Sequence, residues 1–139
     1  MTETPHPGVV LFVSDLRRAA RFFESVAGCR IGHASADYLT LDAAGLELVL
    51  HRIPAEVAGP EDGVGHDSGG SAPAVREDAS LKLCLVVASL GEARARAAEQ
   101  GGGLRDASWE WDGDGYRACD GWDPEGNVVQ FREPLRTSV

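Results

Sequence analysis

The chain contains the same unit twice. The stretch VVLFVSDLRRAARFFESVAGCRI (Val9–Ile31) returns, shifted by 74 positions, as LCLVVASLGEARARAAEQGGGLR (Leu83–Arg105). In each copy an apolar run leads through a small polar residue into an Ala- and Arg-rich stretch that stops at glycine. A tandem repeat requires one architecture to serve both halves, and it aligns them position by position. The alignment matches Gly8 with Lys82, each of which lies one residue before its apolar run.

Each copy predicts one helix. Ser14 or Asp15 can cap a helix over Leu16–Ala27, where apolar residues recur at helical spacing and a glycine follows. In the second copy Ser89-Leu90-Gly91-Glu92 has the form of a capping box, in which the serine oxygen accepts from the third amide while the glutamate reaches back. This helix is predicted to run to about Gln100, before three glycines.

Strands surround each helix. A short strand precedes each one, at Val9–Val13 and Leu81–Val87. Three strand-like runs follow the first helix, near Cys29–Ser35, Tyr38–Asp42 and Leu46–Arg52. Three more follow the second helix, near Leu104–Trp111, Tyr116–Asp120 and Asn127–Arg132, separated by Gly- and Pro-containing turns. The order βαβββ therefore occurs twice. We expect one domain over 1–139, with a first module at 8–53, a linker or lid at 54–80 and a second module at 81–134.

Composition narrows the class of protein. The 139 residues carry 13 basic and 22 acidic side chains, a net charge of −9. Such a surface repels nucleic acid and anionic membranes and attracts cationic small molecules. No run reaches the ~18 apolar residues of a membrane span, and no signal peptide is evident, so a cytoplasmic location is expected. The three cysteines lack CxxC spacing, which argues against a disulfide framework or a zinc site.

The two βαβββ units, the VSDL step into the first helix and the sequence GWDPEGNVVQF near the C-terminus resemble the vicinal oxygen chelate superfamily. This superfamily includes glyoxalase I, extradiol dioxygenases, and the fosfomycin and bleomycin resistance proteins. The resemblance covers the chain apart from the central linker, and the DPxGN turn is its most specific marker. It implies an α+β fold in which two βαβββ modules form a curved mixed sheet with a central cavity. It also implies a homodimer, with modules paired within or between chains.

The resemblance further implies a set of metal-ligand positions. In the family's enzymes, His, Glu or Gln side chains from the first and last strand of each unit hold a divalent metal. Carried over to this chain, the positions are Gly8, Glu47, Lys82 and Gln130. Glycine has no side chain and a protonated lysine cannot coordinate a cation, so no cofactor is predicted. A shifted site of His6, Glu47 and His51 is an alternative. However, residues four apart on a strand are separated by about 13 Å, so Glu47 and His51 could share a metal only across a bend.

Lys82 has two interpretations. If it points into the cavity with Glu47 and Gln130, its ammonium replaces the positive charge of the metal, pairs with Glu47 and donates to Gln130. Alternatively, it lies at the start of its strand and extends its charge into solvent.

Other candidates for the cavity come from the aromatic residues and from strand parity. The three tryptophans lie in the second unit, where flat rings can stack a planar or cationic ligand, or else belong to the core or a dimer interface. Phe12 and Cys84 share parity with the first-strand metal positions and Val49 with Glu47. The candidate ligand-binding residues are Phe12, Glu47, Val49, Lys82, Cys84, Trp109, Trp111, Trp122 and Gln130.

These residues favour a small-molecule binder of the glyoxalase and bleomycin-resistance type, which captures a planar or cationic molecule without a normal divalent metal. The alternative is an enzyme: a metal-dependent lyase or dioxygenase with displaced ligands, or a metal-free isomerase in which Glu47 is the catalytic base. A regulatory or interaction module is a third possibility. The partners expected are a small-molecule ligand and a second copy of the chain, with no nucleic acid and no membrane.

Overall fold

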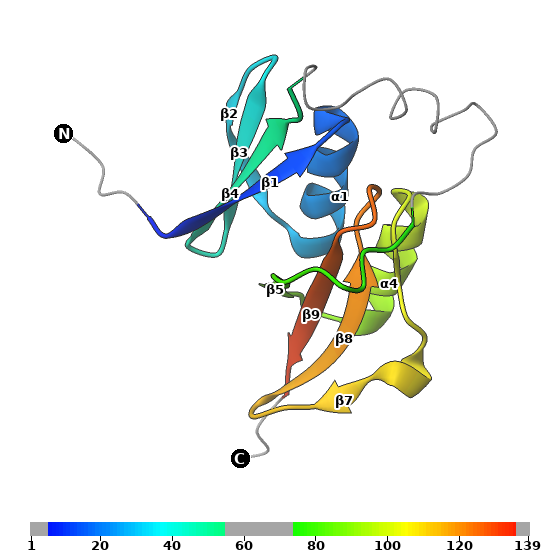
Figure 1. Ribbon diagram of the computed structural model, residues 1–139. Helices are drawn as coiled ribbons and strands as arrows, with labels where there is room; N and C mark the ends of the chain where they lie inside the picture. The colour runs from blue at the N-terminus through cyan, green and yellow to red at the C-terminus, as the bar shows by residue number, and fades with distance from the viewer. Residues whose placement is uncertain (1–5, 55–73, 136–139) are drawn as a thin grey trace.

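The computed structural model describes residues 6–54 and 74–135, and these form two βαβββ modules (Figure 1). The first module consists of β1 (Gly8–Val13), α1 (Leu16–Ala27), β2 (Arg30–Ala34), β3 (Tyr38–Ala43) and β4 (Leu46–Arg52). The second consists of β5 (Leu83–Val86), α4 (Leu90–Glu99), β6 (Gly103–Leu104), the 3-10 helix η1 (Ala107–Trp109), β7 (Trp111–Asp112), β8 (Tyr116–Trp122) and β9 (Val128–Pro134). The predicted α+β fold with a doubled βαβββ order is confirmed.

Each module has its own sheet, and the two sheets share one topology. The first has the strand order β1-β4-β3-β2, and the second has β5-β9-β8-β6 with β7 also paired to β8. In both sheets the first strand runs parallel to the last one, while the other pairs are antiparallel. The repeat seen in the sequence is therefore a repeat of strand pairing as well.

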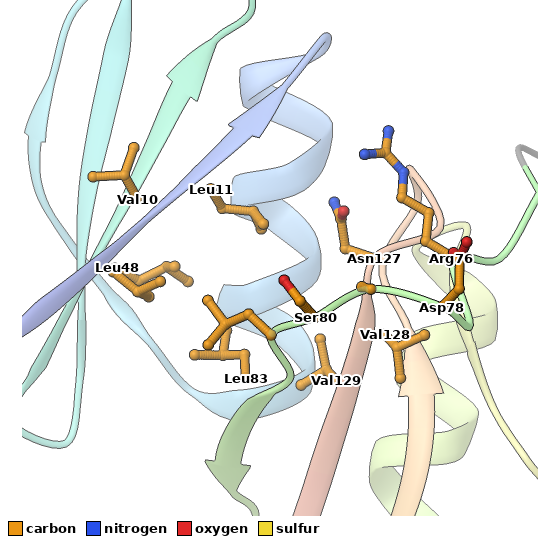
Figure 2. Close-up of a pocket in the computed structure, with 13 residues that line it drawn as sticks. Val10, Leu11, Leu48, Arg76, Asp78, Ser80, Leu83, Asn127, Val128 and Val129 are labelled. Atoms are coloured by element: carbon orange, nitrogen blue, oxygen red, sulfur yellow. The ribbon is translucent and has the colours of Figure 1, made fainter.

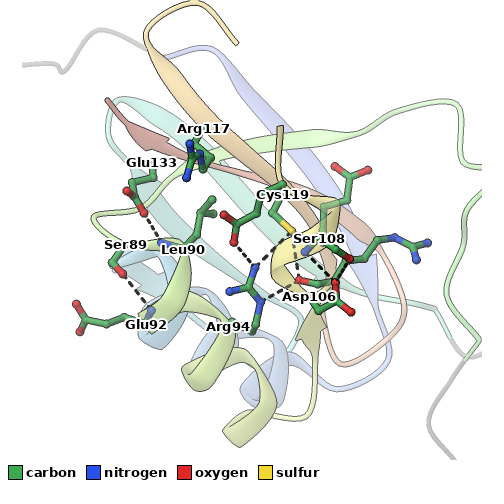
Figure 3. Close-up of polar contacts among 12 residues, drawn as sticks. Ser89, Leu90, Glu92, Arg94, Asp106, Ser108, Arg117, Cys119 and Glu133 are labelled. Carbon is green, nitrogen blue, oxygen red and sulfur yellow. Dashed lines mark hydrogen bonds and ion pairs between the residues drawn. The ribbon is translucent and has the colours of Figure 1, made fainter. Parts of the chain in front are cut away.

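The predicted caps begin both helices, with one change. Asp15 accepts a hydrogen bond from the Arg18 amide at 3.1 Å, and Ser89 accepts from the Glu92 amide at the same distance. The Glu92 carboxylate, expected to complete the capping box, instead lies 3.5 Å from Arg96. Glu133 of β9 takes its place and accepts from the Leu90 amide at 2.7 Å. Figure 3 shows this contact, which ties the last strand to the start of α4.

One hydrophobic core serves both modules. In Figure 1 α1 and α4 lie on the same side of the two sheets, and they pack against each other. Phe22 of α1 is fully buried, with its ring centroid 5.1 Å from that of Phe23 and 6.4 Å from that of Phe131 in β9. Because Phe131 belongs to the second module, the aromatic contact joins the two halves.

The DPxGN turn makes a second connection between the modules. Asp123 is buried and accepts from the amides of Glu125 and Asn127 at 2.9 and 2.8 Å, while its burial raises the pKa of its carboxyl. This confirms the prediction that Asp123 forms a turn. The turn presents the Glu125 carboxylate to the N-terminus of α1, where it accepts from both the amide and the hydroxyl of Ser14 and from the Asp15 amide. The second module thus caps the helix of the first.

One prediction about the second module is wrong. The run 104–111 is not one strand, because the Asp106 carboxylate accepts from the Ser108 amide at 3.0 Å and begins η1. Arg94 of α4 holds the segment 104–111 in place, because it donates to the Arg105 carbonyl at 2.9 Å and to the Glu110 carboxylate at 2.6 Å (Figure 3). Asp120 lies within β8, where the predicted strand over Tyr116–Asp120 places it.

Other boundaries shift by one or two residues; the predicted strand 81–87, for example, begins at Leu83. The predicted linker or lid at 54–80 falls mostly on residues 55–73, outside those that the structure describes. Among the described residues no helix is long and apolar enough to cross a membrane.

We expect Glu125→Ala to lower the free energy of unfolding by about 1–2 kcal/mol, because the amides of Ser14 and Asp15, just before α1, lose their acceptor and the positive end of the helix dipole loses a nearby negative charge. Urea denaturation measures this loss. Glu24→Ala, at an exposed site on the same helix, is the matched control and should have little effect. Equal losses in the two variants would contradict the capping role.

Candidate functional site: the open faces of the two sheets

Each sheet has one face covered by a helix and a second face that the described residues leave open. The alternation of burial along β4 shows this. Leu48 and Leu50 are buried, whereas the residues that alternate with them, Glu47, Val49 and His51, are not. The open face of the first sheet carries Val10, Phe12, Tyr38, Thr40, Asp42, Glu47, Val49 and His51. The open face of the second sheet carries Lys82, Cys84, Val86, Trp111, Tyr116, Asp120, Gln130 and Arg132.

Aromatic and imidazole rings line the first open face. The His51 ring lies 5.6 Å from Phe12 and 6.2 Å from Tyr38, and Tyr38 stacks on His33 at 4.8 Å. At the other end of this face, Glu47 borders a depression of about 570 Å³ with His6, His33, Thr40 and Asp42 among its lining residues. The face therefore combines a hydrophobic half with an acidic half.

The second open face carries a row of connected polar groups. Lys82 Nζ donates to Asp120 Oδ2 at 2.8 Å, whereas Asp120 Oδ1 is buried without a partner among the described residues. On the neighbouring strand, Gln130 Oε1 accepts from Arg132 Nε at 2.7 Å and lies 3.7 Å from the Cys84 thiol. The Gln130 amide is thereby oriented with its oxygen between a cation and a thiol.

Aromatic residues extend this row. The Arg132 guanidinium lies 4.4 Å from the centre of the Tyr116 ring, and Trp111 contacts the same ring edge-on at 6.0 Å. Trp111 is 44% exposed. Its indole therefore has free surface at the border of the polar row, where a flat ligand could stack.

The structure places the other two tryptophans differently. Trp122 shares the parity of Asp120, and its ring lies against the position of Gly103 on the neighbouring strand. Trp109 lies in η1, outside both sheets, where the Arg105 guanidinium lies 4.7 Å from its ring centre. The predicted strand over Leu104–Trp111 would place Trp109 and Trp111 on one strand face, but Trp109 lies in η1 and Trp111 in β7, so they do not share one. Phe12, Glu47 and Val49 lie on the first open face, and Lys82, Cys84, Trp111 and Gln130 on the second.

The strand register decides which residues face each other at the metal positions of the family. Gly8 lies opposite Glu47 in the first sheet, and Cys84 lies opposite Gln130 in the second. Lys82 precedes β5 by one residue and pairs with Asp120. The predicted ion pair between Lys82 and Glu47 is therefore wrong within one chain, because the lysine finds a carboxylate in its own sheet.

The donor set does not fit the metal site of the family's enzymes. A Cβ built on Gly8 would lie 2.6 Å from the Glu47 carbonyl oxygen, so the approach of β1 to β4 leaves no room for a side chain there. The β4 register runs without interruption through Glu47 and His51, so no bend brings these two together for a shifted site. Across residues 6–54 and 74–135, no three His, Cys, Asp or Glu side chains gather closely enough to hold a metal ion. We derive no reaction step through a metal.

The three cysteines are free and differ in exposure. Cys29 and Cys119 are buried, and Cys84 is exposed. Burial raises the pKa of the Cys29 thiol to about 11 and also raises the pKa of Cys119. Cys29 and Cys119 therefore act as small hydrophobic residues of the core. Cys84 instead presents a thiol on the second open face.

Comparison of the whole structure with known proteins identifies the fold. No protein-family model and no curated protein sequence matches the chain. Among solved structures, a glyoxalase/bleomycin resistance protein/dioxygenase family enzyme from Burkholderia phytofirmans PsJN matches with a TM-score of 0.63 and 18% identity, over 92% of this chain and 97% of that one. The chain has the vicinal oxygen chelate fold.

Two further structures with the vicinal oxygen chelate fold match over similar lengths. A glyoxalase/bleomycin resistance protein from Albidiferax ferrireducens T118 gives a TM-score of 0.61 at 16% identity, over 92% of this chain and 97% of that one. The fosfomycin resistance protein FosX from Mesorhizobium loti gives 0.60 at 13%, over 97% and 95%. The resemblance inferred from the repeat and the DPxGN turn is confirmed at the level of the fold.

Among the polar and aromatic residues on the open faces of this vicinal oxygen chelate fold, the sequence did not single out Tyr38, Thr40, Asp42 or Asp120 as ligand-binding candidates. The alternation in YRACDGW (Tyr116–Trp122) is a signal that could have found Asp120. Side chains two residues apart on a strand share a face, so Asp120 lies on the same face as Ala118 and Tyr116. The pairing of Lys82 with Asp120 left no local signal.

We expect Gly8→His to lower the free energy of unfolding by about 1–3 kcal/mol, as overpacking does, and to create no metal site. Urea denaturation and calorimetric titration with Ni²⁺ or Zn²⁺ measure the two effects. Cys84→His is the matched control, because Cys84 occupies the corresponding position opposite Gln130 and is exposed. A Gly8→His protein as stable as Cys84→His would contradict the steric argument.

We also expect iodoacetamide at pH 8 to alkylate only Cys84 in the native protein. The thiolate is the reactive form, and burial disfavours it at Cys29 and Cys119. Intact-protein mass spectrometry should show one fast adduct in the folded protein and three in urea. Rapid labelling of a folded Cys84→Ser variant would show the prediction to be wrong.

Proposed function

We propose that the chain binds a planar small molecule, with cationic character favoured, on its open sheet faces and without a divalent metal. The second open face is the observation that carries this proposal. It presents an exposed indole at Trp111 beside an oriented amide at Gln130 and an unpartnered buried acceptor, Asp120 Oδ1. A ligand N–H that reaches this acceptor would satisfy a group that otherwise costs free energy.

The charges of the two faces suit different parts of a ligand. On the second face Lys82 pairs with Asp120 and Arg132 donates to Gln130 on the adjacent strand, so a ligand's aromatic plane and N–H groups suit this side. Glu47 and Asp42 lie on the first face, at the opposite end from the stacked Tyr38 and His51 rings, and their carboxylates suit a cationic group. The net charge of −9 adds a long-range attraction for cations.

We further propose that a complete binding cavity forms between two copies of the chain. Glu47 and Gln130 belong to two different sheets, and neither of the two principal depressions in the described structure contains both. The open faces expose Phe12, Tyr38 and Trp111, a pattern typical of surfaces that a partner covers. The acidic first face and the more basic second face are complementary, which favours their association across a homodimer.

Sequestration of a toxic compound is the biological role that fits this proposal. Neighbouring structures are described as bleomycin and fosfomycin resistance proteins, and a binder that captures a drug requires no chemistry of its own. The proposal therefore includes a cytoplasmic protein that protects by binding. The alternative of an enzyme with Glu47 as base predicts turnover of the bound compound.

We expect EDTA-treated protein to bind planar cations, tested by isothermal titration calorimetry with bleomycin, proflavine and ethidium. Trp111→Leu should weaken binding two- to thirtyfold, the equivalent of about 0.5–2 kcal/mol of aromatic stacking. Trp109→Leu is the matched control, because Trp109 is also exposed but lies outside the open faces. Bound ligand should also slow alkylation of Cys84.

Subunit mixing then tests the shared cavity. A Glu47→Ala copy paired with a Trp111→Leu copy leaves one site fully intact if each site uses the first module of one chain and the second module of the other. If each site lies within one chain, the mixture has no intact site. Three outcomes would overturn the binder: no affinity for any of the three compounds, stoichiometric metal whose removal abolishes binding, or conversion of the ligand.

A further inference from the structure

A cavity of about 390 Å³ lies between the two modules, and of the candidate ligand-binding residues on the open faces none lines it. It forms where β1 and β5, the first strands of the two sheets, approach each other without pairing. The first module contributes apolar side chains from Val9, Leu11 and Leu48, and the second contributes Leu83, Val128 and Val129. Figure 2 shows side chains from both modules pointing into the space between the strands.

The cavity is an extension of the hydrophobic core. Val9, Leu11 and Leu83 are partly buried and pack against core residues, and Leu48 and Val129 are buried core residues themselves. These side chains point to the helix-covered side of the sheets. Glu47, Gln130 and Trp111 do not line the cavity, so it is separate from the site proposed above.

A fixed segment closes one side of the cavity. Residues 76–81, which we call the strap, run from the DPxGN turn to β5. The Arg76 amide donates to the Gly126 carbonyl at 2.8 Å, and Glu77 forms an ion pair with Arg105. A Cβ at Gly126 would lie 2.2 Å from the Ala74 carbonyl oxygen, and its φ of +87° also favours glycine. The strap therefore rests against the turn, and the wall of the cavity exists before any ligand binds.

Polar groups gather at one end of the apolar space. Arg76, Asp78, Ser80 and Asn127 line the cavity there. In Figure 2 the Arg76 guanidinium extends past Asn127, away from the Asp78 carboxylate, and the Ser80 hydroxyl points toward the space between the strands. No ion pair of Arg76 occurs within residues 6–54 and 74–135. An arginine beside an amide is a suitable partner for a carboxylate.

We propose that this cavity binds an aliphatic carboxylic acid of medium length, with its chain among the Leu and Val side chains and its carboxylate at Arg76 and Asn127. Its size lies within the roughly 300–1,000 Å³ typical of small-molecule pockets, and an apolar lining with a few convergent polar groups is their usual composition. Leu81 and Val10, at the mouth, are 68% and 51% exposed, and an aliphatic chain would cover them. The branched aliphatic lining offers no ring for stacking, which favours a flexible chain over a planar molecule.

Calorimetric titration with decanoate, below its micellar concentration, tests the proposal, with decanol as the uncharged comparison. Decanoate should bind more tightly than decanol. Arg76→Gln should weaken decanoate about tenfold, as loss of a charge-assisted hydrogen bond does, and leave decanol unchanged. Equal affinity of wild type and Arg76→Gln for decanoate would overturn the assignment of the carboxylate.

Filling the cavity provides the second arm. Ser80→Trp places a ring in the space from an exposed strap position, and Ser80→Ala is the matched control that leaves the space open. Ser80→Trp should lose decanoate binding at least tenfold while Ser80→Ala retains it. Unchanged binding in Ser80→Trp, confirmed as folded by its thermal transition, would overturn the site, as would a wild type that binds no decanoate. If the wild type forms dimers without binding decanoate, and Ser80→Trp dissociates those dimers, the cavity would instead be assigned to contact with a second copy of the chain.

The outcome is independent of the proposed function. Ser80→Trp leaves Trp111, Gln130 and Glu47 unchanged, so its affinity for bleomycin, proflavine or ethidium should equal that of the wild type. Trp111→Leu should correspondingly retain decanoate binding. Failure of one pair of experiments therefore leaves the other interpretable.

Discussion

The relative placement of the two modules depends on a carboxylate that crosses between them. Glu125 leaves the DPxGN turn of the second module and accepts from the amides of Ser14 and Asp15, the two residues just before α1 in the first. Its negative charge lies at the positive end of the helix dipole, so the contact is electrostatically favourable as well as hydrogen-bonded. With the packing of Phe22 against Phe131, it makes α1 and α4 neighbours, and this leaves the other face of each sheet without a cover from the described chain.

The same turn organises the space between the modules. Asp123 holds the turn from inside, and Gly126 lets the backbone of the strap lie directly against it. A single short motif thus sets three features: the entry into β9, the cap of the other module's helix and the wall of the intermodule cavity. This explains in physical terms why the turn was the most specific marker in the sequence.

Local chemistry made most of the fold predictable, whereas contacts between distant strands did not. Helix α1 begins and ends where its cap and glycine predict, because those signals act within a few residues. The partner of Lys82 depends on which strand lies beside which, so the sequence left Glu47 and solvent as alternatives, whereas the structure gives Asp120. The run 104–111 has strand-forming residues, but an Asp–Ser hydrogen bond and the anchoring by Arg94 override that preference.

The closeness of β1 to β4 at Gly8 has a consequence for the divergence of the two halves. A duplicated unit begins with equivalent positions, yet here one copy has closed the space opposite Glu47 and the other keeps an exposed thiol opposite Gln130. Restoring a metal ligand would therefore require different changes in the two halves. In the first half the backbones of β1 and β4 would have to separate, whereas in the second half an exchange of side chains would be enough. Anyone redesigning this scaffold to coordinate a cation should begin from Cys84, Gln130 and Asp120.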